Sequence, residues 1–144
     1  MRKLSTFLSA PVRENGRLAE AVFILLFVRL LFGMLPFSMA VSAIQIKSGN
    51  PKWGDVSPTA ADNVGRAIIR AARHVPFRAA CLQQSFAALL MLRRRRMAAT
   101  VHLGVRRRGN PNALMAHAWC LSGEVPVVGA SDARSFVSIA AFAG

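Results

Sequence analysis

Cys81 and His117 are the two residues whose types and positions best suit nucleophilic catalysis in this sequence. Cys81 opens a run whose apolar spacing predicts a helix, and a thiol at a helix start faces unpaired backbone N–H groups and the positive end of the helix dipole. These groups stabilise a thiolate and can hold the oxyanion of a tetrahedral carbon. His117 lies on a predicted strand, 36 positions later (117 − 81). Strand alternation puts Met115, Trp119 and Leu121 on its face, and a neighbouring strand can present its imidazole to the thiol.

The competing interpretation of Cys81 is packing, because cysteine is among the most buried residue types and this one begins a stretch rich in Ala and Leu. Cys120 fits packing better, since it points away from the predicted His117 face and begins no helix. The three histidines and two cysteines have no close paired spacing of the kind that binds a metal. We therefore expect no metal ion and no other cofactor.

Three further residues are candidates for supporting roles. A third group should orient the imidazole, and the acidic residues after the histidine are Glu124 and Asp132; we favour Asp132, in the loop beyond the last predicted strand. Gln84 lies about one helical turn past Cys81, where its amide could donate to a substrate carbonyl or face solvent. Trp119 is either a core residue or a wall of the substrate site that shields the thiolate from water.

The elements that must hold these residues begin with an apolar segment. Residues 18–35 are nearly all aliphatic or Phe, and Pro36 follows them as a stop signal, which predicts one helix within an N-terminal extension at residues 1–45. The length approaches that of a membrane span, but Arg29 would be costly at mid-membrane. We expect the helix to lie on the catalytic domain, on a partner or on a membrane surface. A basic lead-in precedes it: Arg2, Lys3, Arg13 and Arg17.

A linker at residues 46–60, rich in Gly, Pro, Asn and Ser, separates this extension from a predicted catalytic domain at residues 61–144. Within that domain the patterns predict helices at residues 64–74 and 81–96 and strands at residues 99–107, 113–121 and 124–129. Asp62 is the expected N-cap of the first helix. The sequence therefore predicts an α+β fold in which a Cys-bearing helix packs on a small antiparallel sheet.

The charge balance points to a partner or surface of opposite sign, because 19 basic residues face 6 acidic ones, a formal net charge of +13. Nucleic acid is not the expected partner, since the chain contains no Tyr and no motif that reads bases. The N-terminus lacks the apolar core and cleavage site of a secretory signal. We expect a cytoplasmic protein with reduced thiols, and association with a membrane is the alternative.

The ordered motifs resemble those of a known family. They are CLQQSFAALLMLRRRR, a strand ending in Leu-Gly-Val-Arg, and Ala-His-Ala-Trp with Gly-x-x-Val soon afterwards. Between about Asn63 and Phe136 the sequence resembles the transglutaminase-like proteins of lasso-peptide biosynthesis, specifically the stand-alone leader peptidases. The resemblance implies a transglutaminase-like, papain-like cysteine protease core with Cys81 as nucleophile and His117 as base. It also implies three partners: a precursor peptide, a separate protein that recognises its leader, and an ATP-consuming lasso cyclase.

One position departs from the pattern of that family, whose complete triads carry an Asp about a dozen residues after the His. Gly129 stands at this distance. Either Asp132 reaches in from the following loop, or the Cys-His pair works with a backbone or amide group, or activity is reduced. The competing functions are a non-catalytic membrane-associated binding module, in which Cys81 only packs, and an acyltransferase of the same fold.

Overall fold

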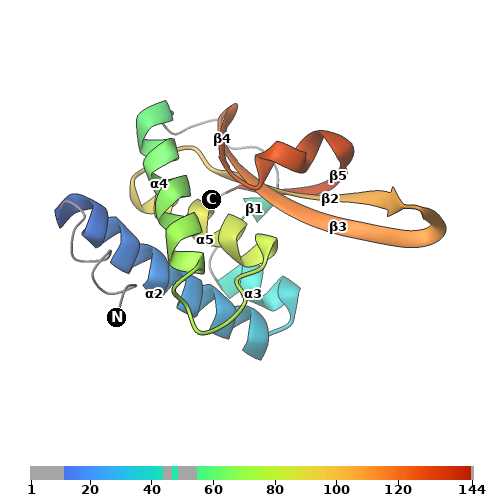
Figure 1. The fold of residues 1–144 in the computed structure, drawn as a ribbon, viewed down its shortest axis with the longest axis horizontal. Helices are drawn as coiled ribbons and strands as arrows, with labels where there is room; N and C mark the ends of the chain where they lie inside the picture. The colour runs from blue at the N-terminus through green and yellow to red at the C-terminus, as the bar shows by residue number, and fades with distance from the viewer. Residues whose placement is uncertain (1–11, 44–46, 49–54, 144) are drawn as a thin grey trace.

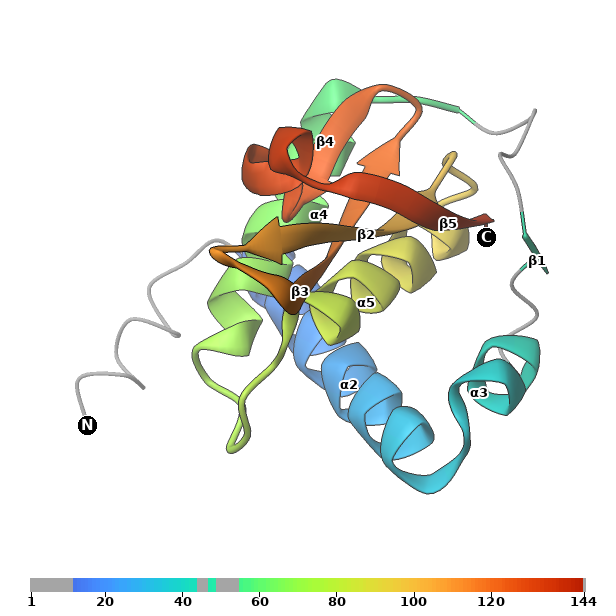
Figure 2. The same cartoon turned by 90° about the vertical axis from the view of Figure 1, so that its right-hand side faces the viewer.

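Helices cover one face of an antiparallel sheet in the computed structural model, which describes residues 12–43, 47–48 and 55–143 (Figures 1 and 2). The strands lie in the order β1-β5-β2-β3-β4, so strands distant in sequence are neighbours in the sheet. Their bounds are β1 Lys47–Ser48, β2 Thr100–Arg108, β3 Asn110–Ser122, β4 Val125–Val128 and β5 Val137–Ala143. The predicted α+β class and the three predicted strands are confirmed.

Strand β5 was not predicted, and it lies on the opposite side of β2 from β3. It arrives there through η1 (Ala130–Ser135), a short 3-10 helix that leads the chain from β4 back across the sheet. The β2–β3 hairpin extends well past the helices in Figure 1. Strand β1 falls inside the predicted linker and pairs with β5, while residues 44–46 and 49–54 of that region lie outside the described residues.

Helix α5 (Cys81–Arg94) is the centre of the core and begins at Cys81, as predicted. It packs against α2 and α4 on one side and against β3 on the other. Every side chain from Ser85 to Leu92 is buried, so apolar groups surround the helix instead of forming a single stripe. Burial on all sides leaves the helix no freedom to rotate, and this fixes where Cys81 lies.

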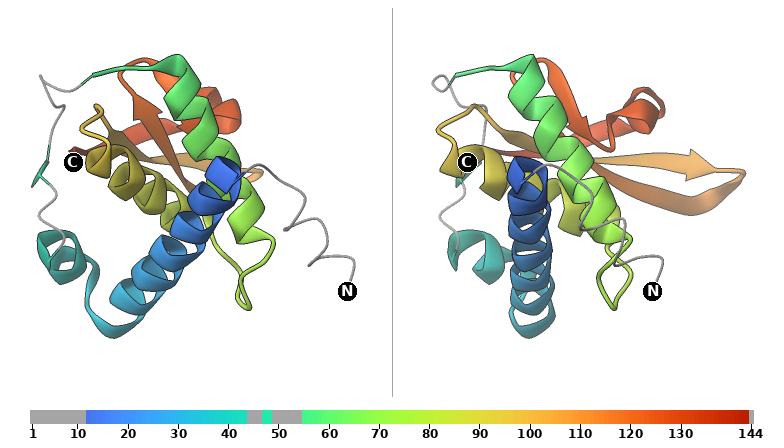
Figure 3. Two further views of the ribbon diagram at one scale, coloured as in Figure 1. Left: turned by 90° about the vertical axis from the view of Figure 1, so that its left-hand side faces the viewer. Right: turned by 60° about the vertical axis from the view of Figure 1, so that its left-hand side comes forward.

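Helix α2 (Val12–Met34) contains most of the predicted apolar helix but starts six residues earlier (18 − 12). Leu18, Ala21, Leu25 and Val28 have exposed fractions of 1% or less, and their spacing forms one helical face. This face packs on α4 and α5, which α2 crosses on the outside (Figure 3). The predicted stop holds, because the helix ends before Pro36 and a short helix, α3 (Phe37–Ala43), follows.

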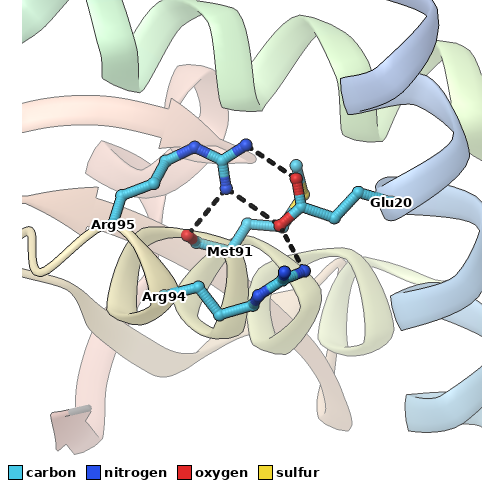
Figure 4. A network of polar contacts seen from close by, with 4 residues as sticks. All are labelled: Glu20, Met91, Arg94 and Arg95. Carbon is cyan, nitrogen blue, oxygen red and sulfur yellow. Dashed lines mark hydrogen bonds and ion pairs between the residues drawn. The ribbon is translucent and has the colours of Figure 1, made fainter.

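An ion-pair network ties α2 to the end of α5 (Figure 4). The Glu20 carboxylate accepts hydrogen bonds from Arg95 at 2.6 and 2.9 Å and from Arg94 at 2.8 Å. Arg95 also donates to the backbone carbonyl of Met91 at 3.0 Å. The side chain of Glu20 is only 16% exposed, so the network combines charge with partial burial and sets the rotation of α2.

The N-cap of helix α4 (Pro58–Ala72) is Ser57 and not Asp62, which was the predicted cap. Ser57 caps the helix, and its hydroxyl accepts a hydrogen bond from the backbone N–H of Ala60 at 3.2 Å. Asp62 lies in the second turn and pairs with Arg66 at 2.9 Å. Pro58 suits the first position of a helix, where its missing N–H costs nothing, and the residue before that position is the N-cap. Ser57 stands there, and serine is one of the preferred N-cap residues. The helix therefore begins inside the predicted linker.

No helix in the described ranges combines the length and the unbroken apolar character that a membrane span needs. Arg2 and Lys3 of the predicted basic lead-in belong to residues 1–11, which lie outside the described residues.

Replacing Glu20 by Gln should lower the free energy of unfolding by about 1–2 kcal/mol, because both of its arginine partners lose a partly buried counter-charge. Urea denaturation at low and high salt measures the loss, which should shrink as salt screens the wild-type pairs. Asp62→Asn is the matched control, since its exposed pair with Arg66 should be worth less than about 0.5 kcal/mol. Equal losses in the two variants would contradict the structural role of Glu20.

Candidate active site

Cys81 and His117 line the same cavity, which has a volume of about 280 Å³. Cys81 comes from the start of α5 and His117 from β3, so the cavity lies where the helical layer meets the sheet. The remaining lining residues are apolar: Phe37, Leu82, Leu103, Gly104, Val105, Ala116, Ala118 and Ile139. Both residues line an apolar cavity that could take an apolar side chain of a peptide. The imidazole of His117 itself lies on the face of β3 that carries Trp119, whereas Cys120 on the other face packs against the helices.

The backbone just before Cys81 is held by two glutamines of α5. Gln84 donates from its side-chain amide to the carbonyl of Ala79 at 2.8 Å. Gln83 accepts from the backbone N–H of Ala80 at 3.3 Å. Ala80 has an extended backbone and no side-chain acceptor that could cap the first N–H groups of α5. Those donors next to Cys81 are of the kind that can hold an oxyanion.

His117 makes a short hydrogen bond with the backbone at the position of the expected acid. Its Nε2 lies 2.7 Å from the carbonyl oxygen of Gly129. A carbonyl oxygen can only accept, so Nε2 must carry the proton in this contact. The neutral ring then has Nδ1 free as a proton acceptor, which is the form that a general base needs.

Gly129 can approach His117 because it has no Cβ. Its backbone is left-handed, with a φ of 72°. A Cβ at this position would lie 2.7 Å from the carbonyl oxygen of Ala118 and 3.4 Å from Nε2 of His117. Glycine is therefore required both for the local conformation and for the close contact.

Aromatic rings hold the imidazole from two directions. The ring centroid of His117 lies 5.1 Å from that of Phe136 and 6.0 Å from that of Trp119. His102 stacks on Trp119, with centroids 5.6 Å apart, and burial lowers the pKa of this histidine. The predicted strand alternation is confirmed for His117 and Trp119, which lie on one face of β3.

Gly104 makes room for this aromatic packing and was not predicted as a site residue. It pairs with His117 across the sheet, and a Cβ there would lie 2.8 Å from the ring of Trp119 and 2.9 Å from Phe136. The sequence signal was a glycine in the middle of a strand, which often marks a close approach of another group. Phe136 had no such signal, because its contact with His117 depends on the unpredicted path of η1 and β5.

The other predicted site residues are Trp119, Gln84 and Asp132. Trp119 is buried and touches the His117 ring, while Gln84 secures the segment before Cys81. Asp132 lies in η1, three residues after Gly129, and its side chain is outside the part that the structure describes. Its role as a third catalytic group stays a prediction. Among the described residues, no cluster of three or more His, Cys, Asp or Glu side chains could hold a metal ion.

The two cysteines are free thiols in contrasting surroundings. Cys120 is fully buried in the core between the sheet and the helices, and this burial raises the pKa of its thiol to about 12. Cys81 is partly exposed at the cavity. The burial of Cys120 confirms that it is a packing residue, while the catalytic role of Cys81 stays a prediction.

A family model described as the transglutaminase-like superfamily matches residues 23–141. The match begins in α2 and ends in β5, so it includes α5, β3 and the cavity between them. Comparisons with curated proteins and with solved structures gave no match.

At pH 8, iodoacetamide should alkylate Cys81 and leave Cys120 unmodified in the folded chain. The thiolate is the reactive form, and the raised pKa of Cys120 keeps its thiol protonated well above this pH. Intact mass and peptide mapping measure the labels. Cys81→Ala should take up label only after denaturation in urea, and rapid labelling of the folded variant would refute the assignment of Cys120 to the core.

Gly129→Ala should weaken the hydrogen bond to His117 and mix the two tautomers of its imidazole, because the added Cβ collides with the Ala118 carbonyl. The ¹⁵N shifts of labelled His117 report the tautomer, and the wild type should carry its proton on Nε2. The matched control is Gly109→Ala, whose φ of 58° adds a similar left-handed strain of about 1–2 kcal/mol, with no atom within 4 Å of the new Cβ. A wild-type ring protonated on Nδ1 alone would contradict the assignment.

Proposed function

The chain belongs to the transglutaminase-like superfamily, which contains cysteine proteases and transglutaminases, and we propose that it is a cysteine peptidase that removes the leader from a lasso-peptide precursor. The observation that carries the proposal is the shared apolar cavity of Cys81 and His117. The finer assignment is supported by the ordered resemblance to stand-alone leader peptidases, from the helix that opens at Cys81 to the Ala-His-Ala-Trp segment around His117.

In the first step His117 acts as general base. For this step the imidazole and the Cys81 thiol must come together, and Nδ1 then accepts the thiol proton while the sulfur attacks the scissile carbonyl carbon. The hydrogen bond from Nε2 to Gly129 keeps the other nitrogen available for this proton and holds the resulting imidazolium. The tetrahedral oxyanion is stabilised by backbone N–H groups at the start of α5.

Collapse of the tetrahedral intermediate breaks the carbon–nitrogen bond and forms a thioester between Cys81 and the leader. His117 gives its proton to the leaving amine, which is the N-terminus of the core peptide. Water then attacks the thioester with His117 again as base, and the leader leaves as a carboxylic acid while the thiol is restored. The freed core amine is the group that a lasso cyclase would join to a side-chain carboxyl.

The cavity and the charge suggest what such a substrate looks like. The apolar lining favours a precursor with an apolar side chain beside the scissile bond. The net charge of +13 favours an acidic leader or an acidic leader-recognition protein. Both partners enter the proposal through the family resemblance and through this complementarity of charge.

Cys81→Ala should abolish cleavage of the precursor, with a fall in rate on the order of a thousandfold or more, because the nucleophile is lost. The assay supplies precursor and recognition protein and follows the products by mass spectrometry. Cys120→Ala is the matched control and should retain cleavage, since this thiol is buried away from the cavity. Unchanged cleavage by Cys81→Ala would eliminate the peptidase proposal and favour a non-catalytic binding module.

The product masses also separate hydrolysis from acyl transfer, which the same superfamily makes a candidate. Hydrolysis adds one water across the cleaved bond, whereas transfer to an amine joins the leader to that amine without adding water. A leader–amine conjugate as the main product would replace the peptidase by an acyltransferase that uses the same two residues.

A further inference from the structure

Helix α2 has a second apolar face, opposite the one that packs in the core. Phe23, Phe27, Leu30 and Met34 have exposed fractions of 73, 49, 61 and 79%. Their spacing of four, three and four residues places them along one side of the helix. A run of large apolar side chains this exposed marks a surface that is covered in use.

The outward direction of this face is fixed by the rest of the fold. Leu18, Leu25 and Val28 anchor the opposite face in the core. The acidic residues of α2 are both in ion pairs: Glu20 with Arg94 at the end of α5 and Arg95 just after it, and Glu14 with Arg70 of α4. Figure 3 shows α2 lying across the outside of α4 and α5, where no other described element covers it.

Positive charge flanks this helix. Arg29 of α2 lies over the ring of Phe77, 5.5 Å from its centroid, so the loop between α4 and α5 lies beside α2. That loop carries Arg73 and Arg78, both exposed, and it contains no acidic residue. Because both acidic residues of α2 are already in ion pairs, the side of α2 next to this loop carries a net positive charge.

We propose that this face of α2 rests on an anionic lipid surface, with Phe23, Phe27, Leu30 and Met34 among the acyl chains. A helix that lies in the plane of a membrane inserts one apolar face and places basic residues at the headgroups, and α2 with its neighbouring loop has this arrangement. A second copy of the chain fits less well, since Arg29, Arg73 and Arg78 would meet like charges. The proposal is independent of the peptidase proposal.

Sedimentation with sucrose-loaded vesicles tests the proposal on the full chain. The wild type should bind vesicles of 70:30 phosphatidylcholine and phosphatidylglycerol, and it should bind pure phosphatidylcholine vesicles much more weakly. The variant Phe23→Ser/Phe27→Ser/Leu30→Ser should bind the anionic vesicles about tenfold less tightly or worse, because inserted apolar area is lost. A charge variant, Arg73→Glu/Arg78→Glu, should lose the preference for anionic lipid and the salt dependence.

Two controls keep the outcomes distinct. Leu114→Ser removes a side chain that is 68% exposed on the β2–β3 hairpin and should leave vesicle binding unchanged. Thermal unfolding of each variant shows that the loss is not a loss of fold. Equal vesicle binding by the wild type and the triple variant, or no binding by the wild type, would overturn the proposal. If the wild type is a dimer and only the triple variant is a monomer, the face would be assigned instead to contact with a second copy of the chain.

Discussion

The complete burial of α5 is the constraint on which the rest of the structure depends. Its side chains from Ser85 to Leu92 meet the sheet on one side and α2 and α4 on the other, so no part of this length faces water. A helix enclosed in this way has one permitted rotation and one permitted depth. Cys81 therefore lies at a defined point beside the sheet, and its partly exposed thiol is a consequence of where the core ends.

The histidine is positioned by a different kind of interaction. Its ring is held between Phe136 and Trp119, and its Nε2 is bonded to the Gly129 carbonyl. A backbone dipole can select a tautomer as a carboxylate does, although it brings no full charge to stabilise the imidazolium. The absence of a Cβ at Gly104 and at Gly129 lets these partners come close, so two glycines set the geometry of one imidazole.

Helix α2 has one face in the core and another on the outside of the molecule. One face of α2 supplies part of the core beside α5. The ion pairs of Glu20 with Arg94 and Arg95 hold α2 to the C-terminal end of α5. The other face is apolar as well, which explains why the sequence of this helix looks uniformly hydrophobic although only one face of it is buried. A membrane contact through this face would place the chain at a surface without requiring a spanning helix.

The predictions that hold are those that depend only on neighbours along the chain. Apolar spacing predicted that α5 begins at Cys81, and alternation predicted that His117 and Trp119 share a face of β3. Two features could be seen only in the folded chain: the place of β5 beside β2 and the hydrogen bond between the Gly129 carbonyl and His117. These contacts join segments that lie far apart in the sequence, and a backbone carbonyl carries no residue type by which it could be recognised. Periodicity reports which face of an element is apolar, but only packing shows what that face meets.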